Sequence, residues 1–293
     1  LFPWFHPHGI KELAETRGLR IAYAIIHLLE SLEAGDLEDR LNALRSLRDE
    51  VLHASAGSMP KNAARVLLSI MKDLIRAHGK EIEQLKLAHD FRRVASGKPS
   101  IVRNMLRRYH LLEMPEAWNQ LAFDDHVHDI NTKGRKSASH LIMDAWIKGI
   151  RRLRVIYYNF IDPPSAAELI EAAQIMGVQI RIGIEFSACF RGKYIQLIWV
   201  PRGFSDAQSF LCFLAEEPVR QLMDQGRAVT RYRQRHVLSL LDAFNRVHRP
   251  AVNTATGLEI PPLDAGRFLA FVRPGQPSIL HLAKYIHHQL LPQ

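Results

Sequence analysis

The stretch from Arg152 to Phe186 decides the fold class, because it reads as a strand, a helix and a second strand in succession. It contains "RLRVIYYNF" (152–160), "PPSAAELIEAAQIMG" (163–177) and "VQIRIGIEF" (178–186). The first run is rich in β-branched and aromatic residues, which favour strands. The last alternates apolar and polar residues, which is the period of a strand. This order indicates a parallel α/β unit.

The helix expected over 163–177 has its own start and end signals. Ser165 followed by Glu168 has the spacing of a capping box, and Gly177 stands where a helix would end. Pro218 predicts a kink or a division in the next helical segment. The elements expected downstream are a strand over 193–200, helices over 205–226 and 231–248, a loop-rich connection over 248–266 and a last helix over 278–291.

The first part of the chain is helical in pattern almost without a break from about Ile10 to Met114. Ser58 is placed as an N-cap and Gly79 just past a helix end. The expected helices cover 10–35, 36–57, 58–79, 81–96 and 100–112. Their apolar stripes suit a bundle, and no catalytic set converges in them. We therefore expect an all-helical module over 1–118, serving packing or a protein partner, before an α/β domain over 119–293.

Composition limits the class of protein. A chain of 293 residues at 47% hydrophobic is long enough for two domains. No stretch reaches the roughly 18 apolar residues of a membrane span, and the start "LFPWFHPHG" lacks the order of a signal peptide. Cys189 and Cys212 lack CxxC spacing and stand in apolar surroundings. We expect a cytoplasmic protein with reduced core thiols and no membrane partner.

The charge balance favours anionic partners. The chain has 39 Lys and Arg against 30 Asp and Glu. Basic residues gather in "VRNMLRRYH" (102–110), "KGIRRLR" (148–154) and "RAVTRYRQRH" (227–236). These runs fit either a nucleic-acid surface or solvated helix faces, and the sequence leaves both open.

The segment "AFDDHVHDINTKG" (122–134) carries the candidate chemistry. If a strand ends here, His126 and His128 point to the same side, because strand side chains repeat every two residues. Two imidazoles beside a carboxylate suit zinc, manganese or iron. Such an ion activates water for attack on phosphorus or carbonyl carbon. The alternative is a polar loop that is rich in His and Asp.

Further segments follow "HVH" in a fixed order. They are "SASHLIMDAWIKGI" (137–150), "VIYYN" (155–159), "GIEFSA" (183–188), "RYRQRHVLSLLDAFN" (231–245) and "GQPSILHLAKYI" (275–286), which contains His281. This order resembles the polymerase and histidinol phosphatase (PHP) superfamily of metal-dependent phosphoesterases. The resemblance covers roughly residues 123 to 286. It implies a (β/α) barrel that hydrolyses phosphate esters.

The resemblance also implies a ligand set. His126, His128 and Glu185 would be metal ligands, with Glu185 bridging or terminal in a site of up to three ions. Where the family has Asp and His, this chain has Tyr158 and Asn159, so Asn159 is the remaining ligand candidate. Gln196 or Tyr194 stands where a further His is frequent. An amide oxygen is a poor transition-metal ligand beside imidazole, so we expect at least one metal position to be weak or empty.

Three residues are candidates for the catalytic step itself. Asp129 would orient the imidazoles as an acceptor, and the commoner alternative is a surface turn residue. Arg231 and Arg235, with Arg233 between them, would hold substrate phosphate or solvate a helix. For Glu185, the alternative to a role as metal ligand is an ion pair with Arg181 or Arg191.

Three functions stay open from the sequence. The first is a metal-dependent hydrolase of phosphate esters, acting on a phosphorylated small molecule or nucleic acid. The second is a catalytically degenerate PHP-like scaffold in which the helical module docks a partner. The third is a nucleic-acid-binding module without chemistry. The sequence stops at Gln293 before any equivalent of the family's later strands, so we expect a barrel that is completed by further residues or is truncated.

Overall fold

The computed structural model describes residues 17–48, 57–117, 120–134, 136–204, 206–257, 259–272 and 275–290. Within them the chain is mixed α/β, mostly helical, and carries a four-stranded sheet that curls like half of a barrel. The predicted mixed α/β class is confirmed, and the sheet is compatible with the expected incomplete barrel. The start of the first expected helix and most of 49–57 lie outside the described residues.

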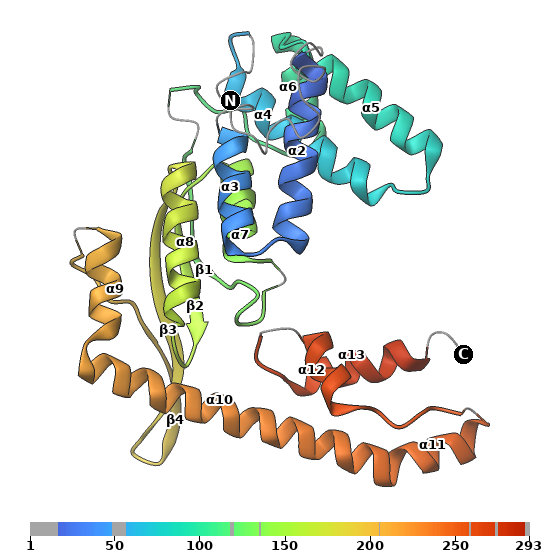
Figure 1. The fold of residues 1–293 in the computed structure, drawn as a ribbon, viewed down its shortest axis with the longest axis vertical. Helices are drawn as coiled ribbons and strands as arrows, with labels where there is room; N and C mark the ends of the chain where they lie inside the picture. Colours follow the sequence, from blue (N-terminus) through green and yellow to red (C-terminus); the bar gives the residue numbers. More distant parts are fainter. Residues whose placement is uncertain are drawn as a thin grey trace. The chain divides into compact units, whose positions relative to one another are not determined.

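The sheet has the order β1-β2-β3-β4 (Figure 1). Its strands are β1 (Ala122–Val127), β2 (Ile150–Tyr158), β3 (Gln179–Phe190) and β4 (Lys193–Trp199). Helices α7 (Ala138–Ile147) and α8 (Pro163–Met176) join β1 to β2 and β2 to β3, which is the crossover connection of parallel strands. The N–H groups of Leu121 and Ala122 donate to the Gly149 carbonyl over 2.9 and 3.1 Å, so β1 and β2 start at the same edge.

Strands β3 and β4 form an antiparallel hairpin. The register extends from Ile184 opposite Trp199 to Phe190 opposite Lys193. Arg191 and Gly192 make the turn, with φ angles of 50° and 74°. Two positive φ angles are what a two-residue turn needs to match the twist of the strands, and Gly192 adopts one without strain.

The N-terminal helices pack around α4. They are α2 (Arg17–Ala34), α3 (Leu37–Leu47), α4 (Pro60–Arg76), α5 (Glu81–Ala95) and α6 (Pro99–Arg108). Helix α4 contacts α2, α5, α6 and α7. The predicted N-cap at Ser58 is wrong, because Met59 is the N-cap and no side chain caps the helix. Pro60 starts α4 instead, since its fixed φ suits the first helical turn.

A buried arginine fixes α4 to its neighbours. Arg65 is fully buried. Its Nε donates to the Ile147 carbonyl over 2.6 Å, and its Nη1 donates to the Leu112 carbonyl over 2.8 Å. Burial lowers the pKa of Arg65 to about 10, so the guanidinium keeps its charge at neutral pH. This side chain therefore ties α4 to the end of α7 and to the segment after α6.

The start of α8 differs from the prediction. Asp162 accepts from the backbone N–H and the hydroxyl of Ser165, over 3.3 and 2.9 Å. Glu168 instead accepts from Arg40 Nε over 2.9 Å and from the Ser139 hydroxyl over 2.8 Å. The predicted capping box of Ser165 and Glu168 is therefore wrong, because tertiary partners hold the glutamate. Burial alone would raise the pKa of Glu168, but the hydrogen bonds from Arg40 and Ser139 bring it below its usual value.

The C-terminal part is helical. It contains α9 (Ala207–Ala215), α10 (Glu217–Ala243), the π-helical turn η3 (Phe244–His248), α11 (Arg249–Thr256), α12 (Ala265–Val272) and α13 (Ile279–Leu290). The division predicted at Pro218 is confirmed. The loop predicted over 248–266 is wrong where α11 forms, because Pro250 is tolerated in the first turn of that helix and Gly257 ends it with a φ of 71°.

Apolar side chains of α10, α12 and α13 form one core. The cluster contains Val237, Leu241, Leu263, Phe268, Val272, Leu282 and Tyr285. Cys189 and Cys212 lie outside any core, since both are exposed. The prediction of core thiols is therefore wrong. Cys189 lies in the exposed end of β3, where the strand has left the buried part of the sheet.

Two compact units divide the chain. The first contains residues 1–126, 136–154 and 167–181, and the second contains residues 127–135, 155–166 and 182–293. Strands β1, β2 and β3 each continue from the first unit into the second. The boundary predicted between residues 118 and 119 stays a prediction. In the described part of the chain, no helix is long and apolar enough to span a membrane.

Glu168 predicts an acid-sensitive contribution to stability. Its folded pKa lies below its usual value, so its contribution is present above the usual value and is lost as pH falls through the folded pKa. We expect Glu168→Gln to lower the free energy of unfolding by about 2 kcal/mol at neutral pH, as for hydrogen bonds to a charged group. Urea unfolding should show this difference shrinking on acidification, while exposed Glu217→Gln has little effect at any pH. A difference that does not change with pH would contradict the assignment.

Candidate metal centre and anion pocket

The structure brings the three predicted metal ligands together. His126 is an exposed residue of β1, His128 is half-buried just past that strand, and Glu185 is buried in β3. One ligand atom from each lies within 4.8 Å of the others. Among the described residues, this is the single group of three His, Cys, Asp or Glu side chains close enough to share an ion.

The loop after β1 is held by Asp129, which is fully buried. One carboxylate oxygen accepts from the backbone N–H of Asn131 over 2.9 Å, and the other accepts from the Tyr157 hydroxyl over 2.9 Å. Its carbonyl accepts from the N–H of Gly134 over 2.8 Å. Asp129 therefore ties the loop to β2, and we infer that it positions the neighbouring His128 while its catalytic role stays a prediction.

His128 is oriented by the backbone of β2. Its Nδ1 lies 2.7 Å from the Ile156 carbonyl oxygen. A carbonyl only accepts, so Nδ1 must carry the proton and Nε2 is the basic nitrogen of the neutral ring. Metal-binding histidines commonly donate their second nitrogen to such a carbonyl. The tautomer that binds a metal through Nε2 is therefore set by the fold.

Glu185 carries the negative charge of the trio. The side-chain amide of Gln196, on β4, donates to Glu185 Oε1. The Glu185 carbonyl accepts from the backbone N–H of Asn159 over 2.9 Å, which links the end of β2 to β3. The Gln196 amide and any bound ion would therefore both contact Glu185, which is the one carboxylate of the trio.

The donor set and spacing fit a transition metal. Two imidazole nitrogens and a carboxylate oxygen suit zinc, manganese or iron. Ligands at about 2.1 Å from a tetrahedral ion lie about 3.4 Å apart. The ligand atoms of the trio lie within 4.8 Å of one another, so small side-chain rotations would bring them to about 3.4 Å. The trio could therefore hold one ion.

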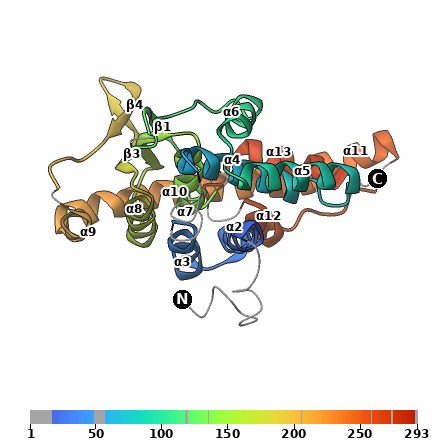
Figure 2. The ribbon, with the colours of Figure 1, turned by 90° about the horizontal axis from the view of Figure 1, so that it is seen from above.

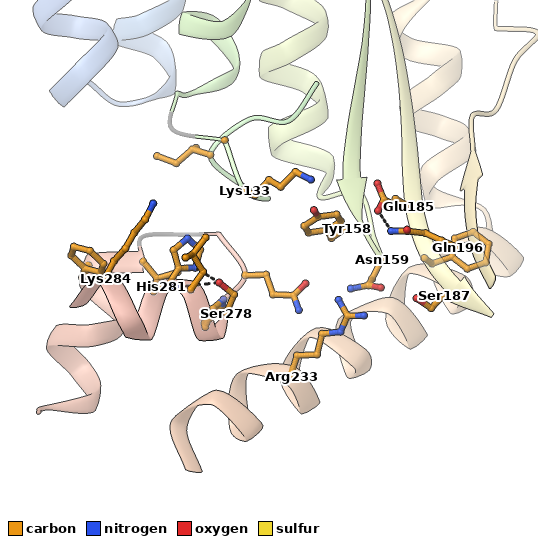
Figure 3. Close-up of a pocket in the computed structure, with 18 of the residues that line it drawn as sticks. Lys133, Tyr158, Asn159, Glu185, Ser187, Gln196, Arg233, Ser278, His281 and Lys284 are labelled. Carbon is orange, nitrogen blue, oxygen red and sulfur yellow. Dashed lines mark hydrogen bonds between the residues drawn. The ribbon is translucent and has the colours of Figure 1, made fainter. Parts of the chain in front are cut away.

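A cavity of about 1020 Å³ opens beside Glu185 (Figure 3). All its lining residues belong to the second unit. They include the cationic side chains Lys133, Arg233 and Lys284 together with His281 and His288. Glu185 is the one carboxylate among the lining residues. The cavity therefore favours an anion.

The cationic side chains come from separate elements. Lys133, in the loop after β1, lies over the Tyr158 ring at 5.4 Å from its centroid. Arg233 extends from α10 toward Asn159, and Lys284 belongs to α13 (Figure 3). Close packing of Gly275 against the Thr132 carbonyl brings the segment before α13 against the same loop, since an added Cβ would lie 2.6 Å from that oxygen.

The arginine that lines the cavity is Arg233 rather than Arg231 or Arg235. All three are exposed residues of α10, and only Arg233 is among the lining residues. At 100° per residue, Arg231 and Arg235 lie about 40° apart and Arg233 lies on the opposite side of the helix. The sequence indicated the helix but not the face that it turns to the cavity.

Asn159 lies on the cavity wall beside Glu185 (Figure 3). It adopts a left-handed φ of 65°, and its side-chain amide donates to the Thr230 hydroxyl over 3.3 Å. A Cβ on Gly226 would lie 2.1 Å from the Asn159 carbonyl oxygen, so a glycine is required there. The structure thus anchors Asn159 at the site, and its role as a ligand stays a prediction.

His281 was indicated only by the family resemblance. Its Nδ1 lies 3.1 Å from the Ser278 hydroxyl (Figure 3). Burial, together with the charge of Lys284, lowers the pKa of His281, so the neutral ring is favoured. Lys133 and Lys284 were not predicted, because their approach to Glu185 depends on tertiary packing that no local pattern encodes.

Comparison with known protein families and with curated proteins gave no match for this chain. The PHP-like class expected from the order of the motifs therefore stays a prediction.

The trio predicts binding of one divalent ion. We expect calorimetry with Zn²⁺ or Mn²⁺ to give a stoichiometry near one, and His126→Ala or His128→Ala to weaken binding by at least about tenfold. Gln196→His should tighten it, because imidazole replaces an amide next to the trio. Exposed His248→Ala is the matched control and should bind as the wild type does. Wild-type protein that binds neither ion contradicts the assignment.

Proposed function

We propose that this chain is a metal-dependent phosphoesterase of the PHP-like class, acting on a nucleotide or another phosphate ester. The observation that carries the proposal is that Glu185 belongs both to the candidate metal trio and to the wall of a cation-lined cavity. An ion and a phosphate group would therefore meet at one carboxylate. The cytoplasmic location expected from the sequence is part of the same proposal.

His126, His128 and Glu185 would hold the ion. A divalent ion there supplies water activation and offsets charge on the phosphoryl oxygens. Lys133, Arg233 and Lys284 are suited to bind phosphate oxygens, Arg233 through paired N–H groups. The Ser278 hydroxyl orients the neutral His281, which can accept the proton that the attacking water gives up.

The cavity is large enough for more than a phosphate ion. Its volume of about 1020 Å³ lies at the upper end of the roughly 300–1,000 Å³ of ligand pockets. Tyr158, Phe186 and Phe271 add aromatic surface to the lining. Aromatic faces bind nucleobases by stacking. These features favour a nucleotide-sized ester over a small phosphate.

One observation favours a second candidate, phosphate-ligand binding without hydrolysis. The Gln196 amide donates to Glu185, and Tyr158 and Asn159 stand where the resemblance places stronger ligands. An amide that competes for the carboxylate weakens the hold on an ion. This candidate shares the loss of catalysis with the degenerate scaffold that the sequence left open as an alternative, and it adds a phosphate ligand to it.

Steady-state hydrolysis of p-nitrophenyl phosphate, its diester and nucleotides in Mn²⁺ or Zn²⁺ tests the proposal. We expect His128→Ala to lose at least about a hundredfold in kcat, the scale on which a lost catalytic contact acts. Arg233→Ala should mainly raise KM, because it removes a phosphate contact. Arg246→Ala on η3 is the exposed control and should leave both constants unchanged. Absence of hydrolysis with retained metal and nucleotide binding would favour the second candidate.

A further inference from the structure

Strand β4 presents apolar side chains to solvent on both faces. Exposed fractions are 84% for Tyr194, 40% for Ile195, 40% for Leu197 and 48% for Ile198. Tyr194 and Ile198 lie on one face, and Ile195 and Leu197 lie on the other, because strand side chains alternate. Scattered exposed apolar residues are common, but four in one strand of seven residues give each face of β4 an exposed apolar pair.

The same strand is the edge of the sheet. In the part of the chain that the structure describes, β4 pairs with β3 alone and no strand adjoins its other side (Figure 2). Proteins usually protect such edges with proline, charged side chains or bulges. Lys193, at the first position of β4, is its single charged residue, and β4 contains no proline. An unprotected apolar edge is a template for another strand.

We propose that β4 pairs antiparallel with β4 of a second copy of this chain, about a two-fold axis at Gln196. In that register Tyr194 lies opposite Ile198, Ile195 lies opposite Leu197, and Gln196 lies opposite its own counterpart. Each apolar side chain therefore meets an apolar side chain on the same face. The central amides can donate to each other.

The charges are compatible with this register. Lys193 lies opposite Trp199, which can accept a cation over its ring. The two Lys193 side chains stand at opposite ends of the paired strands, about 20 Å apart at roughly 3.4 Å per residue. Like charges are therefore kept beyond the screening length of about 8 Å.

The area is sufficient for a specific pair. The four exposed apolar side chains present on the order of 400 Å² per copy, since a large side chain covers roughly 150–250 Å² when fully buried. With the paired main chain, two copies would bury on the order of 1,000 Å², the lower end for a specific interface. The hydrogen bonds of the ladder add to this apolar contact.

Pairing would also alter the candidate site. Gln196 lines the cavity and donates to Glu185, and its counterpart would face it across the axis. The partner's Gln196 would thus lie at the rim of each cavity, and the two half-barrel sheets would become one sheet of eight strands. This inference rests on the strand alone and holds whether or not the chain hydrolyses phosphate esters.

Analytical ultracentrifugation over a wide range of concentration tests the pairing. We expect a monomer–dimer equilibrium for the wild type, and a monomer for Ile198→Lys and for Ile195→Lys. Leu85→Lys on α5, where the side chain is 63% exposed, is the matched control and should leave the equilibrium unchanged. Circular dichroism should show that all variants remain folded, since each replaced side chain is exposed.

A cross-link tests the register. In a background of Cys189→Ser and Cys212→Ser, Gln196→Cys should form a disulfide-linked dimer under mild oxidation. Ile195→Cys should not, because its counterpart is displaced by two residues and lies beyond the reach of about 7 Å between Cα atoms. A monomer at every concentration overturns the proposal. So does a dimer that survives Ile198→Lys and gives no Gln196→Cys cross-link.

Discussion

The fully buried carboxylate of Asp129 is the constraint on which the candidate site depends. A buried charge without partners is costly, and here Asn131 and the Tyr157 hydroxyl satisfy its oxygens. These bonds fasten the loop after β1 to β2, where the Ile156 carbonyl then sets the tautomer of His128. A hydrogen bond to a charged group contributes about 1.5–3 kcal/mol, so several of them hold the loop firmly. The orientation of His128 therefore follows from its contact with β2.

Charge gives the site its chemistry. One carboxylate, Glu185, faces cations that three separate elements contribute, so the field in the cavity is positive except at the point where an ion would lie. The same carboxylate accepts from Gln196. If an ion takes Glu185 from the Gln196 amide, the chain can act as a hydrolase. If the amide keeps Glu185, the chain only binds phosphate. This competition also links the site to β4, the edge strand from which Gln196 extends.

Local patterns predicted what local forces decide. The structure brings His126 and His128 together at the end of β1, and β2, α8 and β3 follow in the predicted order. Both predictions rest on signals that act over a few residues, namely the two-residue period of strands and the residues that start and end helices. The role of Glu168 was predicted wrongly because Arg40, 128 residues away in the sequence, donates to the carboxylate that a capping box would use. The arginines of α10 were candidates for phosphate contact, but the sequence did not single out Arg233, because neighbouring elements decide which face of α10 meets the cavity. The cysteines were predicted as core thiols because their sequence neighbours are apolar, but Cys189 lies in the exposed end of β3 and Cys212 is an exposed residue of α9.

Crystallography with zinc and a phosphate analogue such as vanadate tests the central claim most directly. Anomalous scattering at the zinc edge identifies the ion, and its position identifies the ligands. We predict one strong peak among His126, His128 and Glu185, with His128 bound through Nε2, and the analogue in the cavity against Arg233. A folded protein with no peak at this trio, or with zinc held by other residues, would contradict it.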